Sequence, residues 1–440
     1  MTKNLSMLPR MPADRFTGPF MRFLRIEAVA GAVLLVSTVM ALALANSRWS
    51  DAYLAFWELH AGFHWGDLVL SRSLKHWIND ALMTLFFFVI ALELKRELVL
   101  GELRDRRMAA LPFAAALGGM LVPPAIFLAI VSNGPGAQGW GTVMSTDTAF
   151  VIGCLAILGS RLPQSLRLFL LALAIFDDVG AIMVVAIGYG GTLHGLALGL
   201  ALAGFAGVVA MGWMGVRSVL AFFIVGGAIW LALDEAGIHP TLAGVALGLM
   251  TPAHSWVSDR RLHAILDRVV AYPPGEHWAG DGTARDDLHQ ARIATREALS
   301  PIERLEILLH PWVAFGILPL FALANAAIPF ASATFDPTLT AAIIAAFVVG
   351  KPAGILLFSF LAEKLRIGVR SPDLSWGLLA GGGMLTGIGF TMALFIADLA
   401  FRREVIPSVK LGVLGASALS ALAGMIVLFL ARPSAGTARN

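Results

Sequence analysis

The sequence is poor in charged residues. Only 14% of its 440 residues are Asp, Glu, Lys or Arg, whereas soluble domains carry about 25%. Hydrophobic residues make up 58%, and the mean hydropathy is +0.79. This composition excludes an ordinary soluble protein and predicts one that crosses a membrane many times.

Cysteine is almost absent as well. The single Cys154 lies within an apolar run, which excludes a disulfide framework. Four of the ten histidines fall in the polar stretch 253–304, but their spacing matches no metal motif, so we expect a solvated, partly helical loop there. Although the pI is near 9.2, the basic residues lie between apolar runs, which argues against a nucleic-acid partner. No cofactor is expected.

Long apolar runs are what the chain has instead. A helix of about 20 apolar residues crosses a bilayer. The sequence predicts an all-α polytopic membrane protein with twelve transmembrane helices, near 26–46, 76–97, 109–131, 141–159, 167–188, 194–214, 218–233, 239–252, 307–330, 339–361, 375–400 and 409–431. The first run follows two arginines, as a signal peptide does, but it exceeds the about 7–15 apolar residues of a signal sequence, so we expect an uncleaved span.

The distribution of Lys and Arg predicts the orientation. With a cytoplasmic N-terminus, only six basic residues face the other side: Arg48, Arg72, Lys75, Arg402, Arg403 and Lys410. Both termini are therefore expected in the cytoplasm, which requires an even number of spans. The expected layout is a cytoplasmic segment 1–25, spans one to eight in 26–252, a cytoplasmic insertion 253–304, spans nine to twelve in 305–431, and a cytoplasmic tail 432–440.

Two adjacent carboxylates interrupt the apolar run LALAIFDDVGAIMVVAIGY at 171–189. An ionised side chain at the centre of a membrane helix costs about 2.5–3.5 kcal/mol on insertion scales. Packing gives no reason for Asp177 and Asp178 to be there, so we interpret them as a site for a proton or a cation. Their oxygens suit a small hard cation such as Na⁺ or Li⁺, and a proton would compete for the same oxygens.

Helix-weakening residues lie in the middle of the fourth and eleventh spans, at 145–148 and 386–389. Hydroxyl side chains compete for backbone hydrogen bonds, and each glycine weakens a helix by about 1 kcal/mol. The two spans are the middle members of two triplets, spans three to five and ten to twelve. Interrupted helices in corresponding positions of two halves are typical of a transporter's midplane site. Taken singly, the glycines would also fit packing notches.

Lys351 lies near the centre of the tenth span, where an ammonium needs a carboxylate partner or loses its proton. Asp177 and Asp178 are the candidates. Because successive helical residues point about 100° apart, we expect only one of them to meet Lys351. A charge pair that merely pins two helices is the alternative, and it leaves the second aspartate unexplained.

With these residues in view, the chain resembles the NhaA-type bacterial Na⁺/H⁺ antiporters. The matching segments are WINDALMTLFF (77–87), ALELKREL (91–98), STDTAF (145–150), LALAIFDDVGAI (171–182), IHPTLAGV (238–245), LEILLHPWVAFGILPLFALANA (305–326), GKPAGI (350–355) and GIGFTMALFIADLAF (387–401). The resemblance implies an inverted repeat in which interrupted spans four and eleven cross. It also implies a transporter rather than an enzyme, one that exchanges Na⁺ or Li⁺ for H⁺ electrogenically and under pH control across the bacterial inner membrane.

The resemblance further implies roles for individual residues. Asp177 and Asp178 would bind Na⁺ and exchange protons, Thr146 and Asp147 would lie beside them, and Lys351 would pair with Asp177. A cytoplasmic pH-responsive cluster would consist of Glu93, Arg96, Glu97, Glu306 and His310, and His239 matches a histidine that is also linked to the pH response. For this cluster, a wet helix end with ordinary ion pairs is the alternative. Relatives pair as homodimers through the region after span one, so residues 47–73 could serve that purpose here.

The chain departs from the family pattern in three places: the long insertion 253–304, Ile307 beside Glu306, and Asp398 near the end of span eleven. Other functional classes fit less well. An intramembrane aspartyl protease needs YD and GxGD contexts, which the sequence lacks, and a cation channel needs rings of acidic groups or a carbonyl filter. A sodium-coupled solute symporter is the closest alternative, because interrupted helices and sodium sites occur there too.

Overall fold

The computed structural model describes residues 27–65, 68–132, 134, 136–190, 192–216, 218–271, 282–330 and 334–431. The predicted segment 1–25, the tail 432–440 and the middle of the insertion lie outside these residues. The chain divides into two units. The first contains Met1–Leu82, Arg107–Tyr189 and Pro311–Asn440, and the second contains Met83–Arg106 and Gly190–His310.

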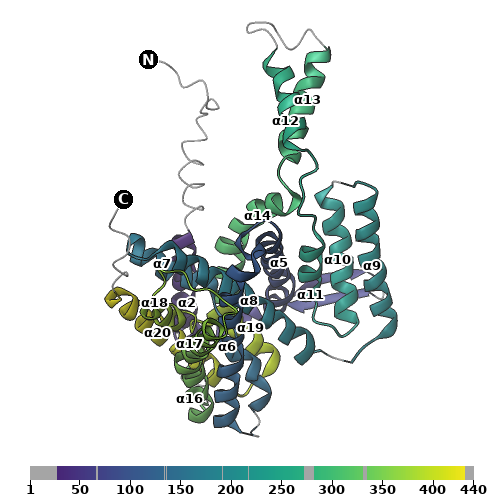
Figure 1. The fold of residues 1–440 in the computed structure, drawn as a ribbon. Coiled ribbons are helices and arrows are strands. Elements are labelled where there is room, and N and C mark those ends of the chain that lie inside the picture. The colour runs from purple at the N-terminus through teal and green to yellow at the C-terminus, as the bar shows by residue number, and fades with distance from the viewer. Residues whose placement is uncertain are drawn as a thin grey trace, which may run out of the picture. The chain divides into compact units, whose positions relative to one another are not determined.

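The first unit is built mainly of helices (Figure 1). They are α2 (Glu27–Ala45), α3 (Ser50–Trp57), α4 (Leu74–Trp77), α6 (Arg106–Val131), α7 (Thr148–Leu158), α8 (Gln164–Gly188), α15 (Leu318–Asn325), α16 (Pro337–Ala345), α17 (Lys351–Lys364), α18 (Trp376–Leu385), α19 (Phe390–Ala400) and α20 (Ile406–Leu430). Strands β1 (His60–Trp65) and β2 (Leu68–Ser73) pair antiparallel, with His60 opposite Ser73. This hairpin falls within 47–73, the region predicted to serve a homodimer, and the homodimer stays a prediction.

The second unit contains α5 (Met83–Val99), α9 (Gly195–Trp213), α10 (Val219–Glu235), α11 (Thr241–Met250), α12 (Asp259–Val270), α13 (Gly282–Glu297) and α14 (Pro301–Trp312). Helix α11 packs against α5 and α10. At Gly244 an added Cβ would lie 2.2 Å from the carbonyl oxygen of Thr84, so glycine permits the close approach of α11 to α5. In the insertion, α12 and α13 lie side by side (Figure 1), with Arg268 and Asp287 paired at 3.5 Å.

Short 3₁₀ and π-helical turns lie between or next to these α-helices. The 3₁₀ turns are Glu102–Arg104, Ala137–Val143 and Gly159–Arg161, and the π-helical turns are Ile78–Leu82, Val313–Ile317 and Ala346–Gly350. The last π turn leads directly into Lys351 and Pro352. Proline has no backbone N–H, so a regular α-helix would lose one hydrogen bond at this point. Single π turns are frequent at functional sites, and this one precedes the buried lysine.

Among the described residues, eight helical segments are long and apolar enough to cross a membrane, or up to ten if each of two bent helix pairs forms one span. The prediction of a mainly α-helical polytopic membrane protein is therefore confirmed. The count of twelve stays a prediction, because some predicted spans contain short helices; α11, for example, has only 10 residues. The inverted repeat also stays a prediction, although both of its triplets lie within the first unit.

Close helix packing in the first unit positions the buried lysine. Helices α6 and α17 meet at Gly118 and Gly354, where an added Cβ on either glycine would lie 2.1–2.2 Å from the carbonyl oxygen of the other. Only glycine permits this approach, as at other membrane helix contacts between small residues. One turn before Gly354, the stem of Lys351 passes about 3.5 Å from where a Cβ of Gly119 would stand. The glycines therefore hold α17 with its lysine inside the packed helices.

Candidate functional site

The interruptions of the fourth and eleventh spans contact each other. In the fourth span the 3₁₀ turn ends at Val143 and α7 begins at Thr148, and in the eleventh α18 ends at Leu385 and α19 begins at Phe390. The N–H of Asp147 donates a hydrogen bond of 2.6 Å to the carbonyl of Ile388, and the hydroxyl of Thr146 donates one of 3.1 Å to the carbonyl of Thr386. Each interruption thus supplies partners for polar groups of the other.

Asp147 links the starts of the two following helices. It caps α7, where one of its carboxylate oxygens accepts a 3.4 Å bond from the N–H of Phe150. Its other oxygen accepts two bonds from Thr391 in the first turn of α19, one from the N–H at 2.9 Å and one from the hydroxyl at 2.7 Å. Helix N-termini stabilise a carboxylate through free N–H groups and the helix dipole. The 3%-exposed Asp147 is therefore well satisfied by the protein itself.

Asp177 and Lys351 form a buried ion pair beside these interruptions. The ammonium of Lys351 lies 2.8 Å from Oδ2 of Asp177, and both side chains are completely buried. The hydroxyl of Thr146 donates a 2.5 Å bond to the same oxygen, and Lys351 also donates to the carbonyl of Met144. The other oxygen of Asp177, Oδ1, is buried and has no hydrogen-bond partner among the described residues.

Asp178 is the next residue on α8 and is 6% exposed. Its charge interacts with that of Lys351, but the direct ion pair is with Asp177. The expectation that only one of the two successive carboxylates meets the lysine stays a prediction. The part of the chain that the structure describes holds no group of three His, Cys, Asp or Glu residues suited to a metal ion. A cation bound here would therefore draw on carboxylate, hydroxyl and carbonyl oxygens together, as hard cations do.

Two contact partners at this site were not foreseen from the sequence. Thr391, which binds Asp147, follows the glycines of the eleventh span, and its place in the first turn of a half-helix is the signal that would have indicated it. Met144 contributes only its backbone carbonyl, so its side-chain type carries no such signal.

In the second unit, Arg96 is the centre of the predicted pH-responsive cluster. It forms ion pairs with Glu97, at 3.0 Å, and with Glu306. Glu93, one helical turn before Glu97, interacts electrostatically with Arg96. One oxygen of Glu306, Oε2, is buried and has no hydrogen-bond partner among the described residues. Thus α5 and α14 place four of the five residues of the predicted cluster together.

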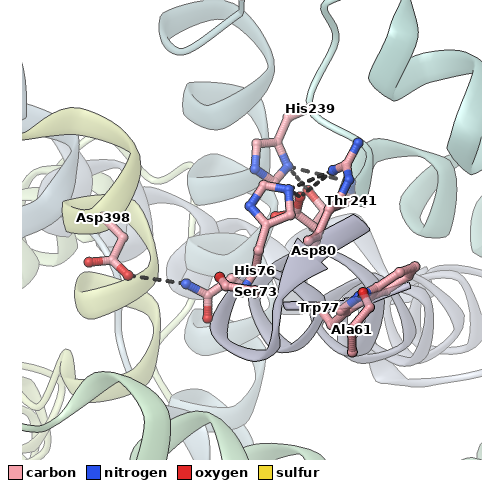
Figure 2. Close-up of polar contacts among 10 residues, drawn as sticks. Ala61, Ser73, His76, Trp77, Asp80, His239, Thr241 and Asp398 are labelled. Atoms are coloured by element: carbon pink, nitrogen blue, oxygen red, sulfur yellow. Dashed lines mark hydrogen bonds and ion pairs between the residues drawn. The ribbon is translucent and has the colours of Figure 1, made fainter. Parts of the chain in front are cut away.

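The two histidines predicted to take part in the pH response lie in other surroundings. His310 is exposed near the end of α14. His239 precedes α11, where its Nδ1 lies 2.7 Å from the hydroxyl of Thr241 (Figure 2). This contact joins His239 to Thr241, the first residue of the helix that follows it.

Residues 21–428 match the family described as Na⁺/H⁺ antiporter 1. The chain is 67% identical over 430 residues to the Na(+)/H(+) antiporter NhaA of Rhizobium meliloti (strain 1021), with 98% of each chain covered. It is 53% identical to NhaA 2 of Acidiphilium cryptum (strain JF-5), with 98% of this chain and 96% of the relative covered. It is also 53% identical to NhaA 2 of Vibrio vulnificus (strain CMCP6), with 97% and 95% covered. Since the family match and these alignments span nearly the whole chain, the protein belongs to the Na⁺/H⁺ antiporter 1 family.

Proposed function

We propose that this protein exchanges intracellular Na⁺ or Li⁺ for external H⁺ across the bacterial inner membrane, with both termini in the cytoplasm. Family membership supports the exchange, and the charge distribution supports the orientation. Asp177 and Asp178 are the residues we propose to bind the cation and to exchange protons. Thr146, Asp147 and Lys351 complete the proposed site.

The observation that carries this proposal is the unequal use of the two oxygens of Asp177. Oδ2 receives the ammonium of Lys351 and the hydroxyl of Thr146, whereas Oδ1 is buried without a hydrogen-bond partner in the described chain. A buried polar atom without a partner is rare and requires an explanation. An oxygen that receives either a proton or Na⁺ during each cycle provides that explanation.

Competition for these oxygens is sufficient to couple the two ions. In the proton-loaded state, the bound protons, carried by the two carboxylates or by one carboxylate and Lys351, compensate the negative charges, and the site has little affinity for Na⁺. When the protons leave, the carboxylates offer two negative charges to a hard cation. If the loaded site can face either side of the membrane, but an empty charged site crosses poorly because of its desolvation cost, Na⁺ must move in exchange for protons.

Lys351 acts in this proposal as an internal counter-ion. While no Na⁺ is bound, its ammonium neutralises Asp177 in the packed interior, where an unpaired charge would be very unfavourable. When Na⁺ replaces the ammonium at the carboxylate, Lys351 releases its proton, so that no unpaired ammonium is left in the packed interior. If more than one proton enters for each Na⁺ that leaves, the membrane voltage drives the cycle with about 2.3 kcal/mol per charge per 100 mV.

The residues predicted to respond to pH and the two interrupted spans also have roles in this proposal. Glu93, Arg96, Glu97 and Glu306, with His239 and His310, are proposed to set the pH at which exchange begins. The proposal for the interrupted spans is that their free carbonyls and half-helix N-termini face the ions, as in other transporters with broken helices.

The test uses everted membrane vesicles that carry a proton gradient and a dye that reports it. Adding Na⁺ or Li⁺ should collapse part of the gradient in vesicles with the wild-type protein. Asp178→Asn should abolish this response, whereas Asp373→Asn, a matched change at an exposed aspartate, should preserve it. If wild-type vesicles take up an organic solute with Na⁺ and do not respond to Na⁺ alone, the protein is a symporter and the proposal is wrong.

A further inference from the structure

Another carboxylate with little exposure lies further along α19, in the first unit. Asp398 follows Thr391 by seven residues, which corresponds to about 10 Å along the helix. The ammonium of Lys75 lies 2.8 Å from Oδ2 of Asp398, and the two side chains are 26% and 11% exposed. The mechanism proposed above does not use this pair, and Asp398 is a position at which the chain departs from the family pattern.

The amide of Asn79 contacts this carboxylate and is itself paired with a second amide. The side-chain nitrogen of Asn79 donates a 3.1 Å bond to Oδ2 of Asp398, which the dashed line at Asp398 marks in Figure 2. Asn79 and Asn325 also exchange hydrogen bonds of 3.2 and 2.7 Å between their amides. The second oxygen of Asp398, Oδ1, is buried without a hydrogen-bond partner in the described chain. Carboxylate and amide oxygens are the ligands that hard cations prefer.

A cavity of about 260 Å³ lies beside Lys75, the partner of Asp398. Lys75, Lys410 and Glu58 line it, together with Trp57 and several small apolar residues. Because a water molecule takes about 30 Å³ in the liquid, the cavity has room for a cation with several waters. It also gives the ammonium of Lys75 space to move away from Asp398. Lys410 stays fixed through a 3.2 Å bond to the carbonyl of Ala327.

We propose that Asp398 is an accessory site for a monovalent cation, and that Lys75 is a tethered occupant which Na⁺ displaces. The ammonium at 2.8 Å already supplies the charge that such a cation would bring, so the exchange leaves the charge beside Asp398 unchanged. Lys75 and Lys410 are among the few basic residues expected on the outer side, so this site serves the outer end of the ion route. The inference rests on the proposed exchange of Na⁺ for H⁺.

Transport kinetics in membrane vesicles of both orientations provide the first test. Right-side-out vesicles present the outer face to added Na⁺, and a trapped pH dye reports the protons that leave. Lys75→Gln should lower the half-saturating Na⁺ concentration about threefold, the effect of losing a competing ion pair worth under about 1 kcal/mol. Asp398→Asn should raise it by a similar factor, and the double variant should behave as Asp398→Asn does. Everted vesicles should show none of these shifts.

Two control variants separate the charge of Lys75 from other charges on the same face. Lys75→Arg keeps the competing charge and should keep the wild-type half-saturation. Arg402→Gln removes an exposed positive charge four residues after Asp398 and should have no effect, whereas an equal shift in Arg402→Gln would indicate a general surface potential and overturn the inference. If the pair only pins helices, both single variants lower the melting temperature and leave half-saturation unchanged, which overturns the inference. A shift that also occurs in everted vesicles overturns it too.

Binding without transport gives the second test. In detergent, the Asp178→Asn variant lacks the proposed main site, so Na⁺ binding at Asp398 can be measured by sodium NMR line broadening. Adding Lys75→Gln should increase the broadening, and a further Asp398→Asn should remove that increase. No increase would overturn the accessory site while leaving the exchange function intact. If wild-type vesicles show no Na⁺-driven proton movement, by contrast, the proposed function itself fails.

Discussion

The ammonium of Lys351 lies 2.8 Å from Oδ2 of Asp177, and neither side chain is exposed. The two residues come from α17 and α8, far apart in the sequence. Loss of one partner strongly destabilises the folded protein, because the remaining charge stays buried without compensation. The same pair is only weakly favourable overall, since both ions lose their hydration. It is therefore suited to being opened by a competing cation.

Lys351→Met should destabilise the protein by about 3–5 kcal/mol, as expected for breaking a buried ion pair. The double variant Lys351→Met/Asp177→Asn should recover part of this loss, because the orphaned charge is gone. Thermal unfolding in detergent measures both effects. Lys364→Met, a matched change at an exposed lysine of the same helix, should shift stability by less than about 0.5 kcal/mol. Equal melting temperatures for Lys351→Met and the wild type would contradict a stabilising pair.

Thr391→Val should destabilise the contact between the two interruptions by about 1.5–3 kcal/mol, the range for a hydrogen bond to a charged group. The change removes the hydroxyl that lies 2.7 Å from Asp147 and keeps the backbone N–H bond. Thr391→Ser retains the hydroxyl and should stay close to the wild type. Melting temperature and maximal exchange rate are the readouts. Identical behaviour of the Val and Ser variants would show that the hydroxyl bond contributes nothing.

Gly389→Ala should reduce both stability and exchange. A Cβ at this position would lie 2.5 Å from ring atoms of Phe347 and 3.0 Å from the carbonyl oxygen of Ser145. Overpacking of this kind typically costs about 1–3 kcal/mol. Gly377→Ala is the control, because its Cβ would meet no atom closer than 3.9 Å. Expression, melting temperature and exchange activity should separate the two, and a fully active, equally stable Gly389→Ala would contradict the tight contact.

Exchange should be weak at acid pH and strengthen as the pH rises. At low pH, protons occupy the carboxylates of Asp177 and Asp178, so Na⁺ binds poorly. For each competing proton, the half-saturating Na⁺ concentration should fall by up to about tenfold per pH unit until the carboxylates are deprotonated. Calorimetry across a pH series should show that Na⁺ binding releases protons in this range. Na⁺ uptake without proton release at every pH would exclude competition.

Glu306→Gln should move the pH at which exchange begins, because it removes one of the two carboxylates paired with Arg96. His310→Ala is expected to shift the same profile. Asp259→Asn is the control, because it removes one negative charge from an exposed residue of α12. Vesicle assays over a pH range measure the midpoint. If neither Glu306→Gln nor His310→Ala moves the midpoint pH, the cluster consists of ordinary ion pairs at a helix end.

The sequence was most informative where a residue type conflicted with its surroundings. Asp177, Asp178 and Lys351 stand out because ionisable groups are costly in apolar helices, and the structure brings Asp177 and Lys351 together. Asp398 stood out as a departure from the family pattern, but the sequence could not name Lys75 as its partner. Partners such as the carbonyl of Met144 leave no trace in residue type, because every residue has a carbonyl.

Apolar runs bounded by charges allow few folds other than a polytopic helical membrane protein, so this much follows from the residue order alone. The residue order also locates the charged residues within those runs and the weak points of two spans. Which polar groups meet follows only from the folded arrangement. Such contacts depend on how helices pack. At Gly118 and Gly354, α6 and α17 approach more closely than any residue with a side chain would permit. Hydropathy is a local property of the chain, whereas pairing is a property of the folded state.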